Sequence, residues 1–73
     1  MIVVHDYRGF RIEVEAVADE GRWNADVRLR RILTSDKPHL ERVTCFKLRP
    51  EHAEWAGELW ARRWIDLKEA TRR

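Results

Sequence analysis

Residues 50–73 read PEHAEWAGELWARRWIDLKEATRR and form the one long helical signal of this 73-residue chain. At 3.6 residues per turn, one side of this stretch collects small and aromatic residues. That side consists of Ala53, Ala56, Gly57, Trp60, Ala61 and Trp64, with Ile65 and Leu67 on its two flanks. The rival side, centred on Arg63, would bury an unpaired guanidinium at a high cost in free energy. We therefore expect a helix whose small residues lie close to a sheet and whose Trp60 and Trp64 fill the wider space beyond them.

Both ends of this stretch have the residues that helix ends favour. Pro50 lacks an N–H that would be unbonded in a first turn, and Glu51 and Glu54 complement the positive end of the helix dipole. The basic residues that complement the negative end are Lys68, Arg72 and Arg73.

The upstream half of the chain has the pattern of strands. Residues 2–7 form a short lead-in strand rich in β-branched side chains. Residues 10–16 and 23–29 alternate apolar and polar side chains, which is the period of a strand with one face in water. Residues 18–21 form the turn between these two strands, and Gly21 is free to adopt a positive φ there.

A further strand is expected over about residues 40–48. The alternation before it changes phase at Arg31, so the preceding strand ends or bulges there, and residues 34–38 form a loop. The two sets that could face the helix are Thr44, Phe46 and Leu48, or Val43 and Cys45. We favour Phe46 and Leu48, because bulky side chains must meet the tryptophans.

The order of these segments predicts one β-β-β-α domain over residues 1–73. Short connections favour antiparallel pairing of neighbouring strands, and a single helix covers one face of a sheet. The expected fold is therefore α+β: a three- to four-stranded antiparallel meander sheet with one C-terminal α-helix packed on one face.

Composition bounds the environment of the chain. Fifteen basic and thirteen acidic side chains give a net charge of +2, which is too even to imply a polyanionic partner by itself. The single cysteine, Cys45, excludes an internal disulfide and favours a reducing cytoplasmic location. No apolar run approaches the ~20 residues that span a bilayer, so we expect no membrane association.

Three short motifs resemble a known group of proteins. They are Tyr7-Arg8-Gly9-Phe10 with Ile12, Gly21-x-Trp23, and Trp64-Ile65-Asp66 at the end of an alanine-spaced helix. These motifs resemble small uncharacterised bacterial β-β-β-α proteins, some of them labelled HlyU-type transcriptional activators. The resemblance covers roughly residues 7–66 and implies this fold and a bacterial cytoplasmic origin. Its motifs are structural in kind and carry no catalytic or ligand residue. Trp55 and Leu59 depart from it, since polar residues are expected there.

No set of residues indicates an enzyme or a cofactor site. The candidate metal ligands His5, His39, His52 and Cys45 lack the close pairing that builds zinc sites. A Cys45 nucleophile would need a histidine beside it, and His5 on a neighbouring strand could reach it. A lone cysteine in a sheet is more often a small buried apolar residue. We therefore predict a non-enzymatic protein without metal or cofactor.

The leading functional hypothesis rests on the helix face opposite the core. Trp55 and Leu59 lie one turn apart there, and Arg62 extends the strip and could pair with Glu51 or Glu58 of a second copy. Tryptophan is enriched at binding hot spots, so we predict a protein–protein interaction module that self-associates. The alternatives are local packing of Trp55 on Leu59, or cover by the N-terminal segment or the loop at residues 34–39.

The alternative function is nucleic-acid binding through a basic sheet face. Arg22, Arg28 and Arg30 share the polar face of one strand, and Arg11 joins them from the adjacent strand. Sheets that bind single strands combine such charges with exposed aromatic rings for base stacking. This face offers no aromatic residue, and intervening acidic residues dilute its potential. We therefore place a nucleic-acid-binding regulator second.

Overall fold

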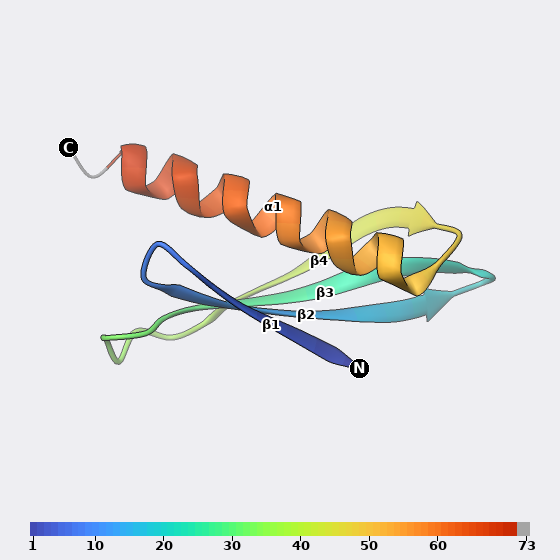
Figure 1. Cartoon of the computed structure of the whole chain (residues 1–73), viewed down its shortest axis with the longest axis horizontal. Helices are drawn as coiled ribbons and strands as arrows, with labels where there is room; N and C mark the ends of the chain where they lie inside the picture. The colour runs from blue at the N-terminus through green and yellow to red at the C-terminus, as the bar shows by residue number, and fades with distance from the viewer. Residues whose placement is uncertain (72–73) are drawn as a thin grey trace.

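The computed structural model describes residues 1–71, so Arg72 and Arg73, expected to complement the helix dipole, lie outside the described part. Its elements are β1 (Ile2–Tyr7), β2 (Phe10–Asp19), β3 (Arg22–Arg31), β4 (His39–Lys47) and α1 (Pro50–Ala70). Each strand pairs antiparallel with the next in the order β1-β2-β3-β4, and α1 crosses one face of the sheet (Figure 1). The predicted α+β meander is confirmed, and its lead-in segment is a full fourth strand.

Two tight hairpin turns set the register of the first three strands. Arg8 and Gly9 have φ values of 48° and 82°, and Glu20 and Gly21 have values of 48° and 80°. A two-residue loop with both φ values positive matches the twist of the flanking strands, and glycine adopts its second position without strain. The positive φ predicted for Gly21 is confirmed. The second turn is two residues shorter than predicted, because β2 stays paired with β3 up to it.

The core lies between α1 and the two central strands. Its buried apolar residues are Phe10, Ile12 and Val14 of β2, Ala25, Val27 and Leu29 of β3, and Ala53, Ala61 and Ile65 of α1. Gly57 marks a very close approach of helix and sheet, since a Cβ added there would lie 2.8 Å from both Ala25 Cβ and Val14 Cγ1. The close packing predicted for the small helix residues is therefore confirmed.

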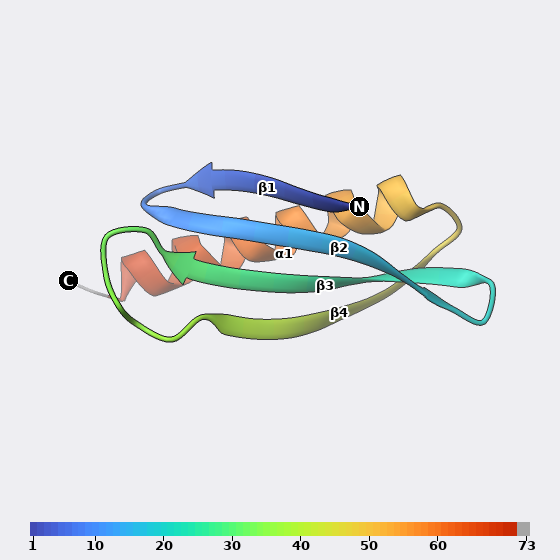
Figure 2. The ribbon, with the colours of Figure 1, turned by 90° about the horizontal axis from the view of Figure 1, so that it is seen from below.

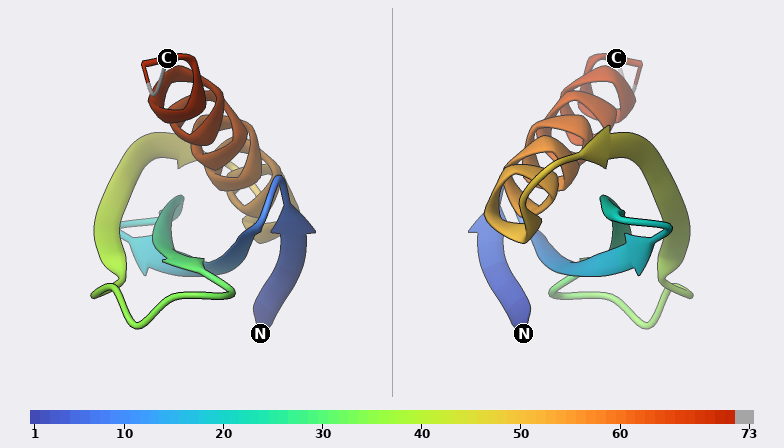
Figure 3. Two further views of the ribbon diagram at one scale, coloured as in Figure 1. Left: turned by 90° about the vertical axis from the view of Figure 1, so that its left-hand side faces the viewer. Right: turned by 90° about the vertical axis from the view of Figure 1, so that its right-hand side faces the viewer.

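The helix is rotated about its axis relative to the prediction. Its buried line consists of Ala53, Gly57, Ala61 and Ile65, at four-residue steps. Trp60 and Trp64 are only half-buried, and the His39 ring of β4 stacks on them with centroids 6.4 Å and 4.9 Å away. Leu67, predicted beside the buried side, is 63% exposed. The close approach at Gly57 leaves no room for an indole along the buried line itself, so the tryptophans lie beside it towards β4, where the sheet curves up beside the helix (Figure 3). Trp64 still meets the Phe10 ring of β2 edge to face, with centroids 6.0 Å apart.

The phase of β4 is opposite to the one we favoured. Val43 packs against the core and Cys45 is half-buried, whereas Phe46 and Leu48, predicted inward, are exposed. The pairing with β3 sets this phase, because Val43 lies opposite Ala25, which faces the helix. Beyond Val43 the register shifts at a bulge, where Phe46 adopts a φ of 48°. We had expected Phe46 and Leu48 to supply large side chains between β4 and the helix. Trp60 and Trp64 of the helix fill that space instead.

Asn24 of β3 holds this bulge in place. Its side-chain oxygen accepts hydrogen bonds from the backbone N–H groups of Cys45 (3.1 Å) and Phe46 (3.0 Å), and its amide group donates to Asp19 (3.3 Å). Asn24 is buried, and a buried amide without partners would cost free energy. The satisfied side chain therefore stabilises an irregular strand end that an alternating sequence pattern does not reveal.

Candidate interaction surfaces

The first candidate surface is an apolar line on the outer side of α1, which we call the helix strip. It consists of Trp55, Leu59, Arg63 and Leu67, at four-residue steps opposite the buried line. Trp55 is 64% exposed, so neither the N-terminal segment nor the loop before β4 covers it. The exposure of Trp55 and Leu59 agrees with the prediction. From the sequence we did not assign Arg63 and Leu67 to the contact surface, although their spacing continues the same line. We considered that line only as an alternative buried side of the helix and rejected it.

Arg62, predicted to extend the contact surface, belongs to a different face. Its guanidinium pairs with Glu58 at 2.8 Å and lies 4.7 Å above the centre of the Tyr7 ring. Glu58 is on the flank of the helix that faces β1, and Tyr7 is the last residue of β1. Arg62 therefore serves contacts within the chain, and the cation of the helix strip is Arg63. Sequence patterns do not reveal the contact between Arg62 and Tyr7, because the two residues are far apart in the chain.

Polar side chains link this flank of α1 to β1 in a continuous row. His5 pairs with Glu58 at 2.9 Å, and the Tyr7 hydroxyl donates to Asp66 Oδ1 at 2.7 Å. Arg8 Nη1 donates to the same carboxylate oxygen at 2.8 Å. Two of the motifs that carry the family resemblance, around Tyr7 and around Asp66, thus contact each other. We call this row, which Arg62 completes, the β1 ladder.

Hydrogen bonds in the β1 ladder shift two titrations in opposite directions. Arg8 first, and Tyr7 second, hold the pKa of Asp66 below its ordinary value of 3.8, because both donate to its carboxylate. The bond to Asp66 raises the pKa of Tyr7 above its ordinary value of 10.0, because the phenol must keep its proton to donate. Both shifts favour the paired state near neutral pH.

The second candidate surface is the sheet face that α1 leaves open. The strand register places five arginines and five carboxylates on this face: Arg11, Arg22, Arg28, Arg30, Arg42, Asp6, Glu13, Glu15, Asp19 and Asp26. The prediction that four of these arginines share one face agrees with the register. The face is nevertheless balanced in charge rather than basic, which corrects the predicted character of this surface.

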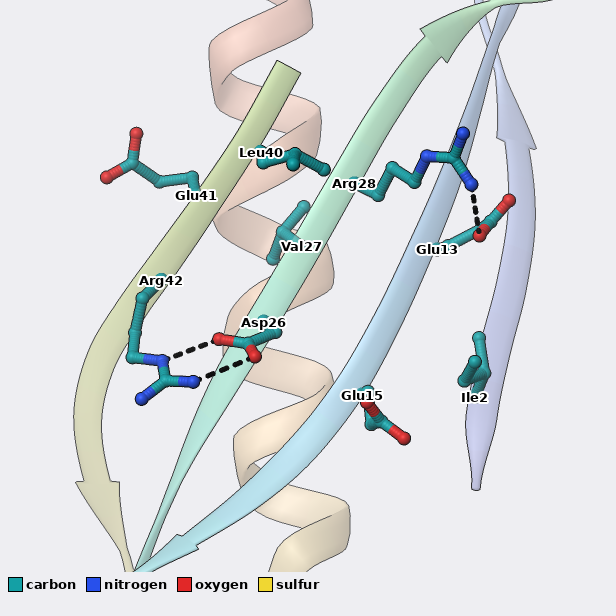
Figure 4. A pocket seen from close by; sticks show the side chains of 9 residues that line it. All are labelled: Ile2, Glu13, Glu15, Asp26, Val27, Arg28, Leu40, Glu41 and Arg42. Atoms are coloured by element: carbon teal, nitrogen blue, oxygen red, sulfur yellow. Dashed lines mark hydrogen bonds and ion pairs between the residues drawn. The ribbon is translucent and has the colours of Figure 1, made fainter. Parts of the chain in front are cut away.

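Ion pairs across neighbouring strands use most of these charges. Arg42 makes two hydrogen bonds to Asp26, at 2.6 Å and 2.9 Å, and Arg28 approaches Glu13 at 3.7 Å (Figure 4). Arg11 pairs with Asp6 at 3.1 Å. The hydrogen bonds from Arg42 and Arg11 lower the pKa of Asp26 and of Asp6 respectively. Within residues 1–71, Arg22 and Arg30 are the two outward arginines of the sheet without an ion pair.

A shallow hollow of about 530 Å³ lies across this open face. Ile2 of β1 and Leu40 of β4 contribute apolar side chains on opposite sides of it, and the two ion pairs lie to either side of the line that joins them (Figure 4). The aromatic residues of β1, β2 and β3 are Tyr7, Phe10 and Trp23, and the register puts all three on the helix side. A nucleic-acid base would thus find no ring on these three strands to stack on.

The residues considered for nucleophilic or metal chemistry are far apart in the sheet. His5 is on β1 and Cys45 is on β4, and these strands are the opposite edges of the sheet. His5 therefore cannot reach Cys45, in contrast to the neighbouring strands we considered. The Cys45 thiol instead lies 3.5 Å from the carbonyl oxygen of Trp23. Residues 1–71 hold no group of three His, Cys, Asp or Glu side chains that could bind a metal ion.

Comparisons with known proteins return no match. No protein-family model, no curated protein and no solved structure is similar to this chain. The resemblance to the bacterial β-β-β-α proteins therefore stays a prediction. The one helix of the described residues, α1, does not have a stretch long and apolar enough to cross a membrane.

Proposed function

We propose that this chain is a small non-enzymatic docking module that binds a second copy of itself through the helix strip. The observation that carries the proposal is the exposure of Trp55 and Leu67 at the two ends of one line, with Leu59 between them. The opposite line of the same helix already supplies the core. A tryptophan that points into water therefore has no role in folding that the packing explains. Large aromatic side chains of this kind are the commonest anchors of protein interfaces.

The helix strip is complementary to itself in an antiparallel arrangement. A two-fold axis near Leu59 places Trp55 of each copy opposite Arg63 of the other. The guanidinium can then lie over the indole, and a cation over an aromatic face is attracted by the ring. Isologous contacts of this kind bury both strips at once. Because the strip follows four-residue steps, two such ridges interlock at a crossing angle of about −50°.

The open sheet face supports nucleic-acid binding less well. Binding to phosphates requires cations that are available to release counterions. Arg11, Arg28 and Arg42 are already engaged by carboxylates of the same face. A nucleic-acid ligand would have to break these pairs and would leave carboxylates facing its own phosphates. A salt-sensitive complex with mixed-sequence DNA or RNA at physiological salt would overturn this ranking.

Sedimentation equilibrium between about 10 μM and about 1 mM tests the proposal. We expect the wild-type chain to dimerise and the double variant Trp55→Lys/Leu59→Glu to stay folded and to associate far more weakly, because charges replace the contact. The matched control is Leu33→Glu/Leu40→Lys, which changes two exposed leucines away from α1 and should dimerise as the wild type does. A wild-type protein that is monomeric at about 1 mM, with Trp55 open to iodide quenching, would exclude the second copy as the partner.

A further inference from the structure

The two edges of the sheet are unequal as sites for adding a strand. An exposed edge strand offers unpaired backbone groups, and proteins usually protect it with bulges and charged side chains. β4 has such protection: its register shifts, Phe46 has a positive φ, and Asn24 takes up two of its N–H groups. Arg42 and Lys47 add charge along the same strand. A further strand therefore cannot pair regularly along the end of β4.

β1 lacks this protection. All of its residues, from Ile2 to Tyr7, pair with β2 without a shift in register, and the strand contains no proline, lysine or arginine. It runs along the rim of the sheet with no described element on its outer side (Figure 2). Ile2 and Val4 are 55% and 54% exposed on the open sheet face. β1 is therefore a regular and unprotected edge, with apolar side chains from Ile2 to Val4.

The hairpin turn determines which backbone groups of β1 point outward. In a two-residue hairpin of this type, the residues flanking the loop form a hydrogen-bonded pair, and such pairs alternate along the ladder. The flanking residues here are Tyr7 and Phe10, so Val3, His5 and Tyr7 exchange hydrogen bonds with β2. The N–H and C=O groups of Ile2 and Val4 are therefore directed away from the sheet. Water can bond these groups in the free chain, and another extended strand can pair with the whole row.

The geometry points to pairing of β1 with β1 of a second copy, antiparallel across a two-fold axis, which joins two sheets into one of eight strands. In the register centred on Val3, Ile2 of each copy lies opposite Val4 of the other, and these two pairs exchange four backbone hydrogen bonds. On the open face, the apolar side chain of Ile2 then lies opposite the apolar side chain of Val4 from the other copy. Asp6 lies beyond the end of the partner strand, so no like charges face each other across the seam.

The β1 ladder makes this edge ready for pairing. His5 and Tyr7 attach the inner side of β1 to α1 through Glu58 and Asp66, so the strand is ordered before a partner arrives. Ordering that is already present lowers the entropic cost of association. This contact goes beyond the proposed function, because it uses a different element and would operate whether or not the helix strip binds.

Amide hydrogen exchange of the full-length Trp55→Lys/Leu59→Glu variant tests the inference separately from the helix strip. We expect exchange at the Val4 N–H to slow between about 50 μM and about 1 mM protein, by about threefold if about 80% of the chains are paired at the higher concentration. The Val3 N–H, which already bonds β2, should not change. An exchange rate at Val4 that is the same at both concentrations would overturn the inference.

A backbone change in the same background gives an independent result. Val4→Pro removes the outward N–H and none of the bonds to β2, so it should abolish the slower exchange at the Ile2 N–H. Val4→Thr keeps the N–H and the β-branched shape, and should pair as the parent does. If both variants behave alike, strand addition at β1 is excluded. If exchange at the Val4 N–H slows only when an extended peptide is added, the occupant of the β1 edge is a peptide strand, and pairing with a second copy is excluded.

Discussion

The two long faces of α1 reverse the usual relation between residue size and burial. The face on the sheet carries Ala53, Gly57 and Ala61 before it reaches Ile65, whereas the face in water carries Trp55, Leu59 and Leu67. The difference shows that the distance between helix and sheet, rather than the bulk available, decides which side is inside. Where backbones approach closely, only small residues fit, and the large apolar residues are left for other contacts.

The largest effect expected from this contrast is at Ile65. Replacing it with alanine should lower the free energy of unfolding by about 3 kcal/mol, because Ile65 is fully buried and its loss leaves a cavity. Leu67→Ala, two residues away on the exposed face, should stay within about 0.5 kcal/mol of wild type. Urea unfolding followed by circular dichroism measures both. Equal losses would mean that the two faces are not distinct in packing.

A smaller effect is expected where helix and sheet are closest. Gly57→Ala should lower stability by about 1 kcal/mol, because overpacking at 2.8 Å outweighs the better helix propensity of alanine. In the background of Val14→Ala, which removes one of the two crowded contacts, the same change should cost less. Thermal unfolding of the four proteins gives the coupling between the two sites. A stabilising Gly57→Ala change in the wild-type background would show that the approach is looser than 2.8 Å.

The smallest effect concerns the flank between the two faces, where the β1 ladder lies. The pKa of Asp66 is lowered, so its contribution to stability is complete above about pH 3.8 and is lost as pH falls through the folded-state pKa. The pKa of Tyr7 is raised, so its contribution is complete below about pH 10 and is lost as pH rises through the folded-state pKa. Asp66→Asn should weaken both dependences.

Tyr7 is the only tyrosine of the chain, so absorbance titration of its phenolate reports the ladder directly. In Asp66→Asn we expect the pKa of Tyr7 to move back toward its ordinary value. Asp6→Asn is the matched control, since Asp6 pairs with Arg11 on the other face of β1. A Tyr7 pKa that is insensitive to Asp66→Asn would show that the ladder does not hold the phenol.

Local patterns in the sequence were sufficient for most of the fold. Alternation in β2 and β3, the positive φ at Gly21 and the small residues of α1 each depend on a few neighbouring residues. The phase of β4 depends instead on its pairing with β3, in which Val43 lies opposite Ala25, and the bulge that follows is held by Asn24, some twenty residues earlier in the chain. No periodicity in β4 itself carries that information.

The candidate surfaces were predicted less completely for the same reason. Trp55 and Leu59 were identified because both lie on one helix and share a spacing. The true neighbours of Arg62 and of the sheet arginines depend on strand register and on the rotation of α1, which a few crowded atoms around Gly57 set. A rotation of less than one residue step moved Leu67 from the flank of the expected buried side to the helix strip.

The bond between Tyr7 and Asp66 also bears on the order in which the chain folds. The meander is made of contacts between segments that follow one another, and such contacts form early because the loops they close are short. Tyr7 and Asp66 are 59 residues apart, so their bond closes a loop of nearly the whole chain. Closing so long a loop costs more conformational entropy than closing a hairpin. We therefore expect the β1–β2 hairpin to form early and the bond between Tyr7 and Asp66 to form last, which makes this bond, rather than the strand pairing, the first contact of β1 to open in native-state fluctuations.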